Sequence, residues 1–445
     1  MGYNNYINII IMEDIKNKIN RLFIKFITKS KKHPFFYDIE TVNDSIYDYM
    51  LYKENRIVQE TKYKFLPNIE QLQDKKEKHT VLTNEKLVKL DREIKNIGNY
   101  EKIFTIVTEI SRYLLKSTAS SNVFETFNKP VVMVIGSGPI GLFTACYLKF
   151  YYEDSIDVVI YDNRIKNPGF RKPYTRQRTF TTSSKYLSLI LPKLYCWDSK
   201  NYINVNIFML EYLLYSQAVL KYKIPIIYQD YSWDDYKRII NDNNIKVVFD
   251  CSGGRLKMDT FKNLNTQYLE NMETINIKLN KKLKINLDKN IVELVEYKND
   301  SKFIKNHFYG SITIYNKNGF FYKKYDMDVT TPQMLKHLTK YNKKFYTYNN
   351  MIKIINGIDD DIERNYLYSQ FMIHKAKLIN KKFYIDIWQI YIRHAVNVAD
   401  IYNDTLIIKT GDSMFHSHFI TGAGLNRTIN LTVKFCNYIN DLINE

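Results

Sequence analysis

A glycine-rich segment at 136–141 carries the residue types that bind a phosphate group. The first glycine permits a tight turn, the second lets the backbone approach a pyrophosphate, and the third lets helix and strand pack closely. The apolar run Val131–Ile135 precedes the segment, and a helix-like stretch to about Tyr152 follows it. Free N–H groups at the start of such a helix attract an anion. The segment therefore predicts a dinucleotide-binding turn formed by Gly136, Ser137, Gly138, Pro139, Ile140 and Gly141.

An acidic residue stands where the dinucleotide fingerprint requires one. Asp162 ends the next strand-like run, about 20 residues beyond the last glycine, where a carboxylate accepts hydrogen bonds from a ribose diol. Asn163 and Arg164 follow it directly and are expected to contact the same nucleotide. The alternative is a glycine turn with only a structural role, and the strand, the helix and the acid together disfavour it. NAD and FAD both use this half-site, so the motif does not choose between them.

A segment near the C-terminus distinguishes the two cofactors. Gly411 and Asp412 follow a strand-like run, and a glycine-rich stretch that begins at Gly422 opens the last helix. Here the sequence resembles the flavoprotein monooxygenases of the p-hydroxybenzoate hydroxylase type, although the usual proline between the two elements is missing. The resemblance assigns Asp412 to the ribityl side of FAD. It assigns the isoalloxazine ring to the N–H groups of the helix start, at Gly424, Leu425 and Asn426.

Two further segments agree with the order of motifs in that family. Arg176 and Arg178 lie where such enzymes place an arginine against the FAD phosphates; either could fill that role, and a surface arginine cluster is the alternative. Asp250 and Gly253 resemble the middle Asp-Gly motif, which closes over the FAD pyrophosphate, with Cys-Ser inserted between them. The spacing is also similar to the MICAL hydroxylase domains, which carry a helical extension. The resemblance covers about 130–260 and 400–440.

The resemblance implies an enzyme in which the flavin performs the chemistry. NADPH or NADH would reduce FAD transiently, and the reduced flavin and O2 would hydroxylate a substrate that the sequence does not identify. Two alternatives stay open: an FAD oxidase or reductase on the same fold, and a non-catalytic flavin-binding or structural protein with an acidic partner. No catalytic side chain is evident. His416 and His418 are weak candidates, since ordinary core or surface histidines are commoner, and no metal site is expected.

Strand-like and helix-like runs alternate around these motifs. Besides the runs already described, strands are expected at 157–162, 224–228, 245–250 and 405–410, with a helix at 208–221. This alternation predicts an α/β, doubly wound Rossmann-type sheet. Between 274 and 346, apolar and polar residues alternate with period two, as in Ser311–Tyr315. This pattern predicts an inserted antiparallel β-sheet substrate domain with a hairpin turn at 316–319.

Three regions follow from these patterns. They are a basic, mainly helical N-terminal extension at 1–128, an FAD-binding Rossmann-type domain at 129–265 and 385–445, and an inserted β-rich substrate or cap domain at 266–384. Within the extension, apolar residues recur at helical spacing between Ile15 and Ile27. This spacing predicts a helix that packs on its own domain, and a helix on a membrane surface is the alternative.

Charge and composition constrain the function less. The formal net charge of +18 favours an acidic partner. Because the chain has no dense Lys/Arg block, the favoured alternative is a lysine excess that follows from codon bias and is spread over a solvated surface, and there is no sequence-specific nucleic-acid motif. The abundance of Lys, Asn, Ile, Tyr and Phe reflects AT-rich codons. The four cysteines form no metal-ligand pattern, which fits reduced thiols in the cytoplasm, or in the host-cell cytoplasm if the source is viral. No run reaches the roughly 18 apolar residues of a membrane span.

Overall fold

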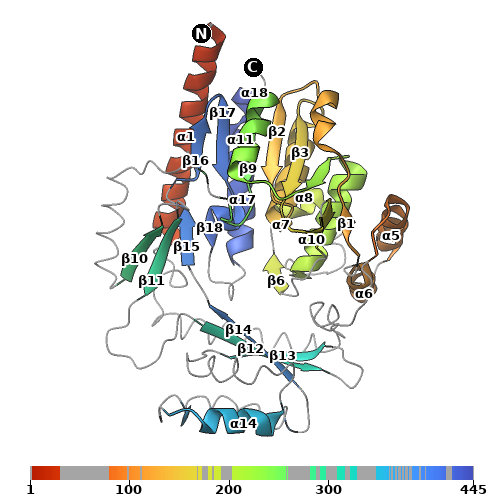
Figure 1. Ribbon diagram of the computed structural model, residues 1–445, viewed down its shortest axis with the longest axis vertical. Helices are drawn as coiled ribbons and strands as arrows, with labels where there is room; N and C mark the ends of the chain where they lie inside the picture. The colour runs from red at the N-terminus through yellow and green to blue at the C-terminus, as the bar shows by residue number, and fades with distance from the viewer. Residues whose placement is uncertain are drawn as a thin grey trace.

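The computed structural model describes most of the chain in separate stretches. These are residues 3–30, 80–97, 100–110, 113–167, 169–172, 179–182, 185–191, 203–256, 258, 281–286, 291–296, 308–315, 321–327, 347–359, 383–389, 392–395, 397–416 and 423–443, with single positions between 361 and 379. A six-stranded sheet forms the largest layer, and helices cover it (Figure 1). Among these residues, no helix combines the length and the apolar character that a membrane crossing needs.

Five parallel strands and one antiparallel edge strand form the central sheet. Their order is β16-β17-β9-β2-β3-β8, and β16 runs against its neighbour β17. The strands are β2 (Val131–Ile135), β3 (Asp157–Asp162), β8 (Ile226–Tyr228), β9 (Ile245–Asp250), β16 (Ala399–Tyr402) and β17 (Thr405–Lys409). All five parallel strands lie within the runs expected from the sequence. The predicted α/β class with a mainly parallel sheet is therefore confirmed.

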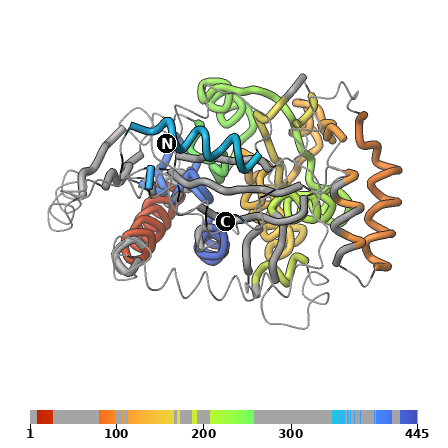
Figure 2. The backbone as a smooth tube through the Cα atoms, turned by 90° about the horizontal axis from the view of Figure 1, so that it is seen from below, coloured from red at the N-terminus to blue at the C-terminus, as the bar shows by residue number. Residues whose placement is uncertain are grey.

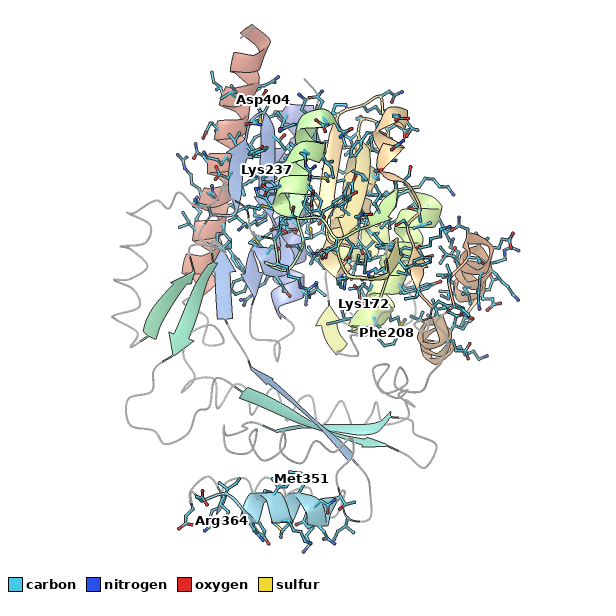
Figure 3. All side chains as sticks on the ribbon, in the orientation of Figure 1. Lys172, Phe208, Lys237, Met351, Arg364 and Asp404 are labelled. Carbon is cyan, nitrogen blue, oxygen red and sulfur yellow. The ribbon has the colours of Figure 1, made fainter. Side chains whose placement is uncertain are left out.

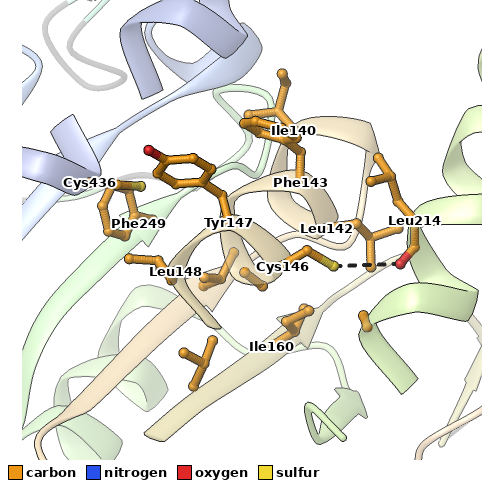
Figure 4. Packing of buried hydrophobic residues seen from close by; sticks show 14 of the residues in the cluster. Ile140, Leu142, Phe143, Cys146, Tyr147, Leu148, Ile160, Leu214, Phe249 and Cys436 are labelled. Carbon is orange, nitrogen blue, oxygen red and sulfur yellow. Dashed lines mark hydrogen bonds between the residues drawn. The ribbon is translucent and has the colours of Figure 1, made fainter. Parts of the chain in front are cut away.

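Strand β2 is apolar throughout because helices cover the sheet on both sides. Val134 belongs to the core shared with α7 (Pro139–Tyr152), α10 (Ile207–Ser216) and α17 (Ala423–Tyr438). Met133, its neighbour, belongs to the opposite core, shared with α11 (Trp233–Asp242). A strand between two helix layers has no polar face. Figure 4 shows the packing on the α7 side, where the thiol of Cys146 lies 3.7 Å from the carbonyl oxygen of Leu214.

Shorter elements complete the region around the sheet. They are α5 (Asn84–Asn96), α6 (Tyr100–Ile110), β1 (Leu115–Lys116), the 3-10 helix η1 (Ser121–Thr126), β4 (Ile165–Asn167), β5 (Phe170–Arg171), β6 (Thr179–Thr182), α8 (Lys185–Ile190), β7 (Ile203–Asn206), the π-helical segment η2 (Gln217–Lys221) and α18 (Asn440–Ile443). Segment η2 continues α10, so the predicted helix at 208–221 is confirmed. Strand β1 pairs with β5, and β5 with β4, which ties the end of the extension to the sheet domain.

The N-terminal helix α1 (Tyr3–Ser30) lies along the antiparallel edge of the sheet (Figures 1 and 2). Its buried face consists of Met12, Ile15, Ile19 and Phe23. Asn20 also binds the edge strand: its side-chain nitrogen donates to the carbonyl of Ala399, and its oxygen accepts from the N–H groups of Val398 and Ala399. The predicted packing of this helix on its own domain is confirmed, and the helix covers a sheet edge that would otherwise be open.

Two small antiparallel sheets are formed mainly by residues of the insert. One has the order β13-β12-β14 and the other β10-β11-β15-β18. Their strands are β10 (Lys281–Asn286), β11 (Ile291–Glu296), β12 (Phe308–Tyr315), β13 (Phe321–Met327), β14 (Phe383–Gln389), β15 (Ile392–Ala395) and β18 (Phe415–His416). The predicted antiparallel pairing is confirmed for these strands. The hairpin turn at 316–319 and the alternating segment at 275–279 lie outside the described residues.

The predicted boundary between the insert and the sheet domain lies at 384/385. That boundary falls inside β14, which pairs with β12 along its whole length because both strands continue the same antiparallel ladder. The predicted insert at 266–384 also includes α14 (Tyr348–Asn356), whose N-cap Thr347 accepts a hydrogen bond from the N–H of Asn350. Met351 is buried on this helix (Figure 3).

The packing of α1 gives a direct test. Ile19→Ala should lower the free energy of unfolding by about 2–4 kcal/mol, because Ile19 is fully buried. Ile10→Ala on the same helix is the matched control: Ile10 is 53% exposed, and its loss should change stability by less than about 0.5 kcal/mol. Chemical unfolding of the two full-length variants measures both values. Equal effects would contradict the packing of this helix face.

Candidate dinucleotide-binding site

The chain reverses its direction across the sheet beside β2. It proceeds from β2 to β3 and β8 on one side, and then crosses back to β9 and β17 on the other. In open α/β sheets, ligands bind at the carboxyl ends of the two strands that flank such a reversal. Here these strands are β2 and β9, which end in register at Ile135 and Asp250. The glycine turn and the loop after β9 therefore begin side by side.

Gly136 and Gly141 are glycines because the surrounding chain leaves no room for a side chain. Gly136 has a φ of +105°, and a Cβ there would lie 2.6 Å from the carbonyl oxygen of Cys251. A Cβ on Gly141 would lie 1.7 Å from the carbonyl oxygen of Gly136. Both glycines thus serve the close packing of the turn, helix α7 and the loop after β9.

Gly138 differs from them, because the described residues leave space beside it. Its φ of −73° and ψ of −179° are extended values that any residue adopts. A Cβ at this position would meet nothing nearer than Arg164 Nη2, at 3.8 Å. Neither backbone strain nor packing therefore requires a glycine. In the dinucleotide fingerprint, a glycine at this position lets a pyrophosphate approach the backbone.

Helix α7 begins at this turn without a side-chain cap. Gly138 is the N-cap residue, Pro139 is the first helical residue, and no side chain of the described region bonds to the cap. The first bond within the helix runs from the N–H of Leu142 to the carbonyl of Gly138. The N–H groups of Ile140 and Gly141 therefore lie in the first turn, where an α-helix offers no carbonyl partner. Such a helix start favours an anion.

Hydrogen bonds join the loop after β9 to the turn after β17. The N–H of Thr410 donates to the carbonyl of Asp250 at 2.9 Å. Ser413 Oγ donates to Asp250 Oδ1 at 3.1 Å and accepts from the N–H of Gly254 at 2.9 Å. Asp250, at the end of the central strand β9, thus holds the two turns together. Its other oxygen, Oδ2, is buried and has no hydrogen-bond partner among the described residues.

Gly411 and Asp412 lie in the 3-10 turn η5 (Gly411–Ser413), next to the glycine turn. Gly411 has a φ of +64°, and a Cβ there would lie 3.4 Å from the Ile140 side chain. Asp412 is exposed, and its Cβ lies 3.9 Å from the position that a Cβ on Gly253 would take. The structure therefore brings together three segments that are far apart in the sequence: the glycine turn, the loop with Gly253 and the turn with Asp412.

A buried network of four charges lies at the adenosine end expected from the fingerprint. Asp162 Oδ2 accepts from the N–H of Ser137 at 2.8 Å and from Arg164 Nη2 at 3.1 Å. Arg164 Nη2 also donates to Glu211 Oε1 at 3.0 Å, and Arg171 Nη2 donates to the same oxygen. Asp162, Arg171 and Glu211 are almost fully buried, whereas 22% of the Arg164 side chain is exposed.

The network determines the charge state of Asp162. Burial works against ionisation of this carboxyl, but the nearby charges of Arg164 and Arg171 and the hydrogen bonds from Arg164 and Ser137 outweigh it. The pKa of Asp162 is therefore well below its usual range, and the residue carries its negative charge at neutral pH. Two arginines and two carboxylates give the cluster no formal net charge.

Several predicted site residues lie outside the described residues or are described only in part. Arg176, Arg178, His418 and Gly422 lie outside the described residues, and only the backbone of His416 is described, in β18. Gly424, Leu425 and Asn426 lie at the start of α17, which contacts α7 and η5. Asn163 follows Asp162 and is half-buried. Among the described residues, no group of three or more His, Cys, Asp and Glu could hold a metal ion.

Sequence reasoning missed three residues that hold the site together. Glu211 and Arg171 complete the charge network, and Ser413 joins the two turns. Glu211 carried a detectable signal, because it is the one acidic residue in the apolar helix α10. A buried carboxylate needs a cationic partner, so its position called for an arginine nearby. Nothing in the local sequence singles out Arg171 or Ser413.

The fold of the chain is similar to solved structures with which it shares little sequence identity. No protein-family model and no curated protein sequence matches the chain. Its fold is similar to p-nitrophenol 4-monooxygenase from Pseudomonas putida, with 12% identity over 71% of this chain and 80% of that one and a TM-score of 0.35. It is also similar to a flavoprotein/dehydrogenase from Cytophaga hutchinsonii, with 11% identity over 69% and 78% of the two chains and a TM-score of 0.31.

A third similar structure is CmlS, a flavin-dependent halogenase, with 11% identity over 69% of this chain and 56% of that one and a TM-score of 0.33. Two of these three proteins are described as a flavoprotein and a flavin-dependent enzyme. TM-scores this low carry no argument about the activity of this chain.

A buried lysine lies at the end of β17, paired in register with Asp250. Burial lowers the pKa of Lys409 to about 8, against the opposing effects of Asp250 and Asp400. The unfolded chain keeps this proton up to its ordinary pKa of about 10.5. Between these two values the unfolded state binds more protons than the folded state, so the contribution of Lys409 to stability rises with pH.

This lysine gives a pH-dependent prediction. The free energy of unfolding of the parent minus that of Lys409→Met should increase by roughly 2–3 kcal/mol from pH 7.5 to pH 10. Tyrosine ionisation affects both proteins equally and cancels in the difference. Chemical unfolding at several pH values measures it, with Lys434→Met, at an exposed position of α17, as the control that should show no such increase. A flat difference for Lys409→Met would contradict a depressed lysine pKa.

Proposed function

We propose that this chain is an FAD-dependent oxidoreductase that acts as a monooxygenase with NADPH or NADH as electron donor. The observation that carries the proposal is that Gly138, at the start of α7, is a glycine although the described residues leave room for a Cβ there. An FAD pyrophosphate needs a close approach to the backbone, and the first N–H groups of α7 would stabilise its negative charge.

The residues around the glycine turn fit the two ends of FAD. Arg164 lies beside the end of β3, on the adenosine side. Asp412 is exposed beside Gly253, where its carboxylate would accept hydrogen bonds from ribityl hydroxyl groups. The start of α17 follows this turn in the chain, and its N–H groups would face the flavin ring. A second set of contacts on the ribityl side supports FAD over NAD.

When bound, FAD supplies the redox chemistry and the activation of O2. The chain holds the nucleotide, orients the flavin ring through the start of α17, and excludes water from the reacting atoms. The sequence has one glycine fingerprint that opens a helix after a strand, and FAD occupies it in this proposal. NADPH or NADH therefore binds transiently, without a Rossmann unit of its own. The substrate enters between the inserted β-rich domain and the flavin.

The two kinds of glycine separate cofactor binding from folding. Gly138→Val should lower FAD affinity on the order of 100-fold and leave the unfolding midpoint of the FAD-free protein unchanged, because its side chain enters the pyrophosphate space and touches little of the chain. Gly141→Ala should instead destabilise the fold, because its Cβ would overlap the carbonyl oxygen of Gly136. FAD fluorescence titration and chemical unfolding measure the two effects. A Gly138→Val protein that binds FAD like the parent would place the cofactor elsewhere.

The reaction class is tested on the purified full-length chain. Denaturation should release FAD, identified by chromatography, and anaerobic stopped-flow mixing with NADPH or NADH should reduce the bound flavin. The right substrate should accelerate that reduction. A flavin reduced by an amine or alcohol and not by NADPH or NADH would indicate an oxidase. A flavin inert to every donor would support a non-catalytic role, and release of NAD alone would refute the FAD site.

A further inference from the structure

Both oxygens of Asp162 are occupied by donors of the chain itself. Oδ2 accepts from the N–H and the hydroxyl of Ser137 and from Arg164 Nη2. Oδ1 accepts from the N–H of Arg164 at 2.6 Å. Arg164 Nε lies between the two oxygens, 3.4 Å from Oδ1 and 3.2 Å from Oδ2. A carboxylate offers about four lone-pair positions, and these five donor atoms exhaust them. The side chain is also only 1% exposed.

A ribose hydroxyl would have to displace one of these donors, and two features oppose that exchange. It would replace a hydrogen bond between two charged groups, Arg164 and Asp162, with one in which only the acceptor is charged, and the attraction of the ion pair would be lost. Arg164 is also held from the other side by Glu211 Oε1, at 3.0 Å, on the buried face of α10. Arg171 donates to that same carboxylate and lies 3.6 Å from Asp162 Oδ2, so the two acids and two arginines fix one another.

Arg164 is the member of this network that a nucleotide can reach. Part of its side chain is exposed, and Nη2 lies 3.8 Å from the position of a Cβ on Gly138, at the edge of the open space. A guanidinium group has only donors, so it can bind an oxygen acceptor of a ribose or a phosphate. It cannot read the hydrogen of a 2′-hydroxyl, which is the group that a free carboxylate recognises.

We infer that Asp162 acts as a buried counter-ion and that Arg164 contacts the adenosine part of the nucleotide, so that the site does not discriminate at the 2′ position of the ribose. The inference rests on the proposed function, because it requires a dinucleotide in the glycine turn. It reverses the role that the fingerprint gives to the acid at the end of the second strand. Asp162 and Glu211 are positioning residues, since both act through Arg164.

Three flavin nucleotides test the inference on the full-length chain freed of bound nucleotide. They are FAD, its 2′-deoxyadenosine analogue and its adenosine 2′-phosphate analogue, titrated by flavin fluorescence. All three should bind with dissociation constants within about threefold of one another, because the 2′ substituent loses no bond to a carboxylate. A 2′-deoxy analogue that binds tenfold or more weakly than FAD would overturn the inference, since loss of a hydrogen bond to a charged group has at least that effect.

Variants assign the effect to residues. Arg164→Gln should weaken all three nucleotides by a similar factor, about tenfold, because the lost contact is common to them. Arg238→Gln, at an exposed arginine of α11 that pairs with Asp235, is the control and should bind all three like the parent. If the parent prefers FAD over the 2′-deoxy analogue and Asp162→Asn does not, Asp162 binds the ribose. This result would overturn the inference and leave the proposed function intact. Failure of the parent to bind FAD at all would overturn the proposed function as well.

Discussion

The contact between the Gly136 turn and the carbonyl of Cys251 is the constraint on which the site depends. At this point the two strands that flank the reversal of the sheet end together, and their loops approach too closely for a side chain at Gly136. The same contact sets the start of α7, because Gly141 packs back on the turn. Asp250 then links the loop after β9 to the turn after β17 through its hydrogen bonds with Thr410 and Ser413. A side chain at Gly136 or Gly141 would therefore push apart the glycine turn, α7 and the loop after β9.

The sequence sufficed for the elements that position the site, and the reason is physical. Buried parallel strands must be apolar on both faces, so β2 and β9 were recognisable from their own residues. A glycine that serves backbone geometry and one that serves a ligand look alike in a sequence. The difference between Gly136 and Gly138 became visible only when a Cβ could be placed against its three-dimensional neighbours.

The role of Asp162 could not be derived from the sequence for a related reason. Its spacing from the glycines matches a ribose-binding acid, but its hydrogen bonding depends on Arg164 and on residues of β5 and α10. Arg171 and Glu211 lie on other elements, and no local sequence pattern predicts that they contact this part of the chain. Spacing predicted where the carboxylate lies, whereas the charges that surround it follow from tertiary packing.

The position of α1 has a consequence for the order in which the protein can fold. Asn20 binds the backbone of Ala399, 379 residues later in the chain. During synthesis α1 emerges long before β16, the strand that it covers, because 379 residues separate Asn20 from Ala399. Among the described elements, those that contact α1 most are β16, α17 and α18, so the apolar face with Ile15, Ile19 and Phe23 meets them only after residue 398 has been made. Closing so long a loop is slow, which makes the docking of α1 a late step of folding. Until then the apolar face of the helix is exposed on the nascent chain and can associate with other chains.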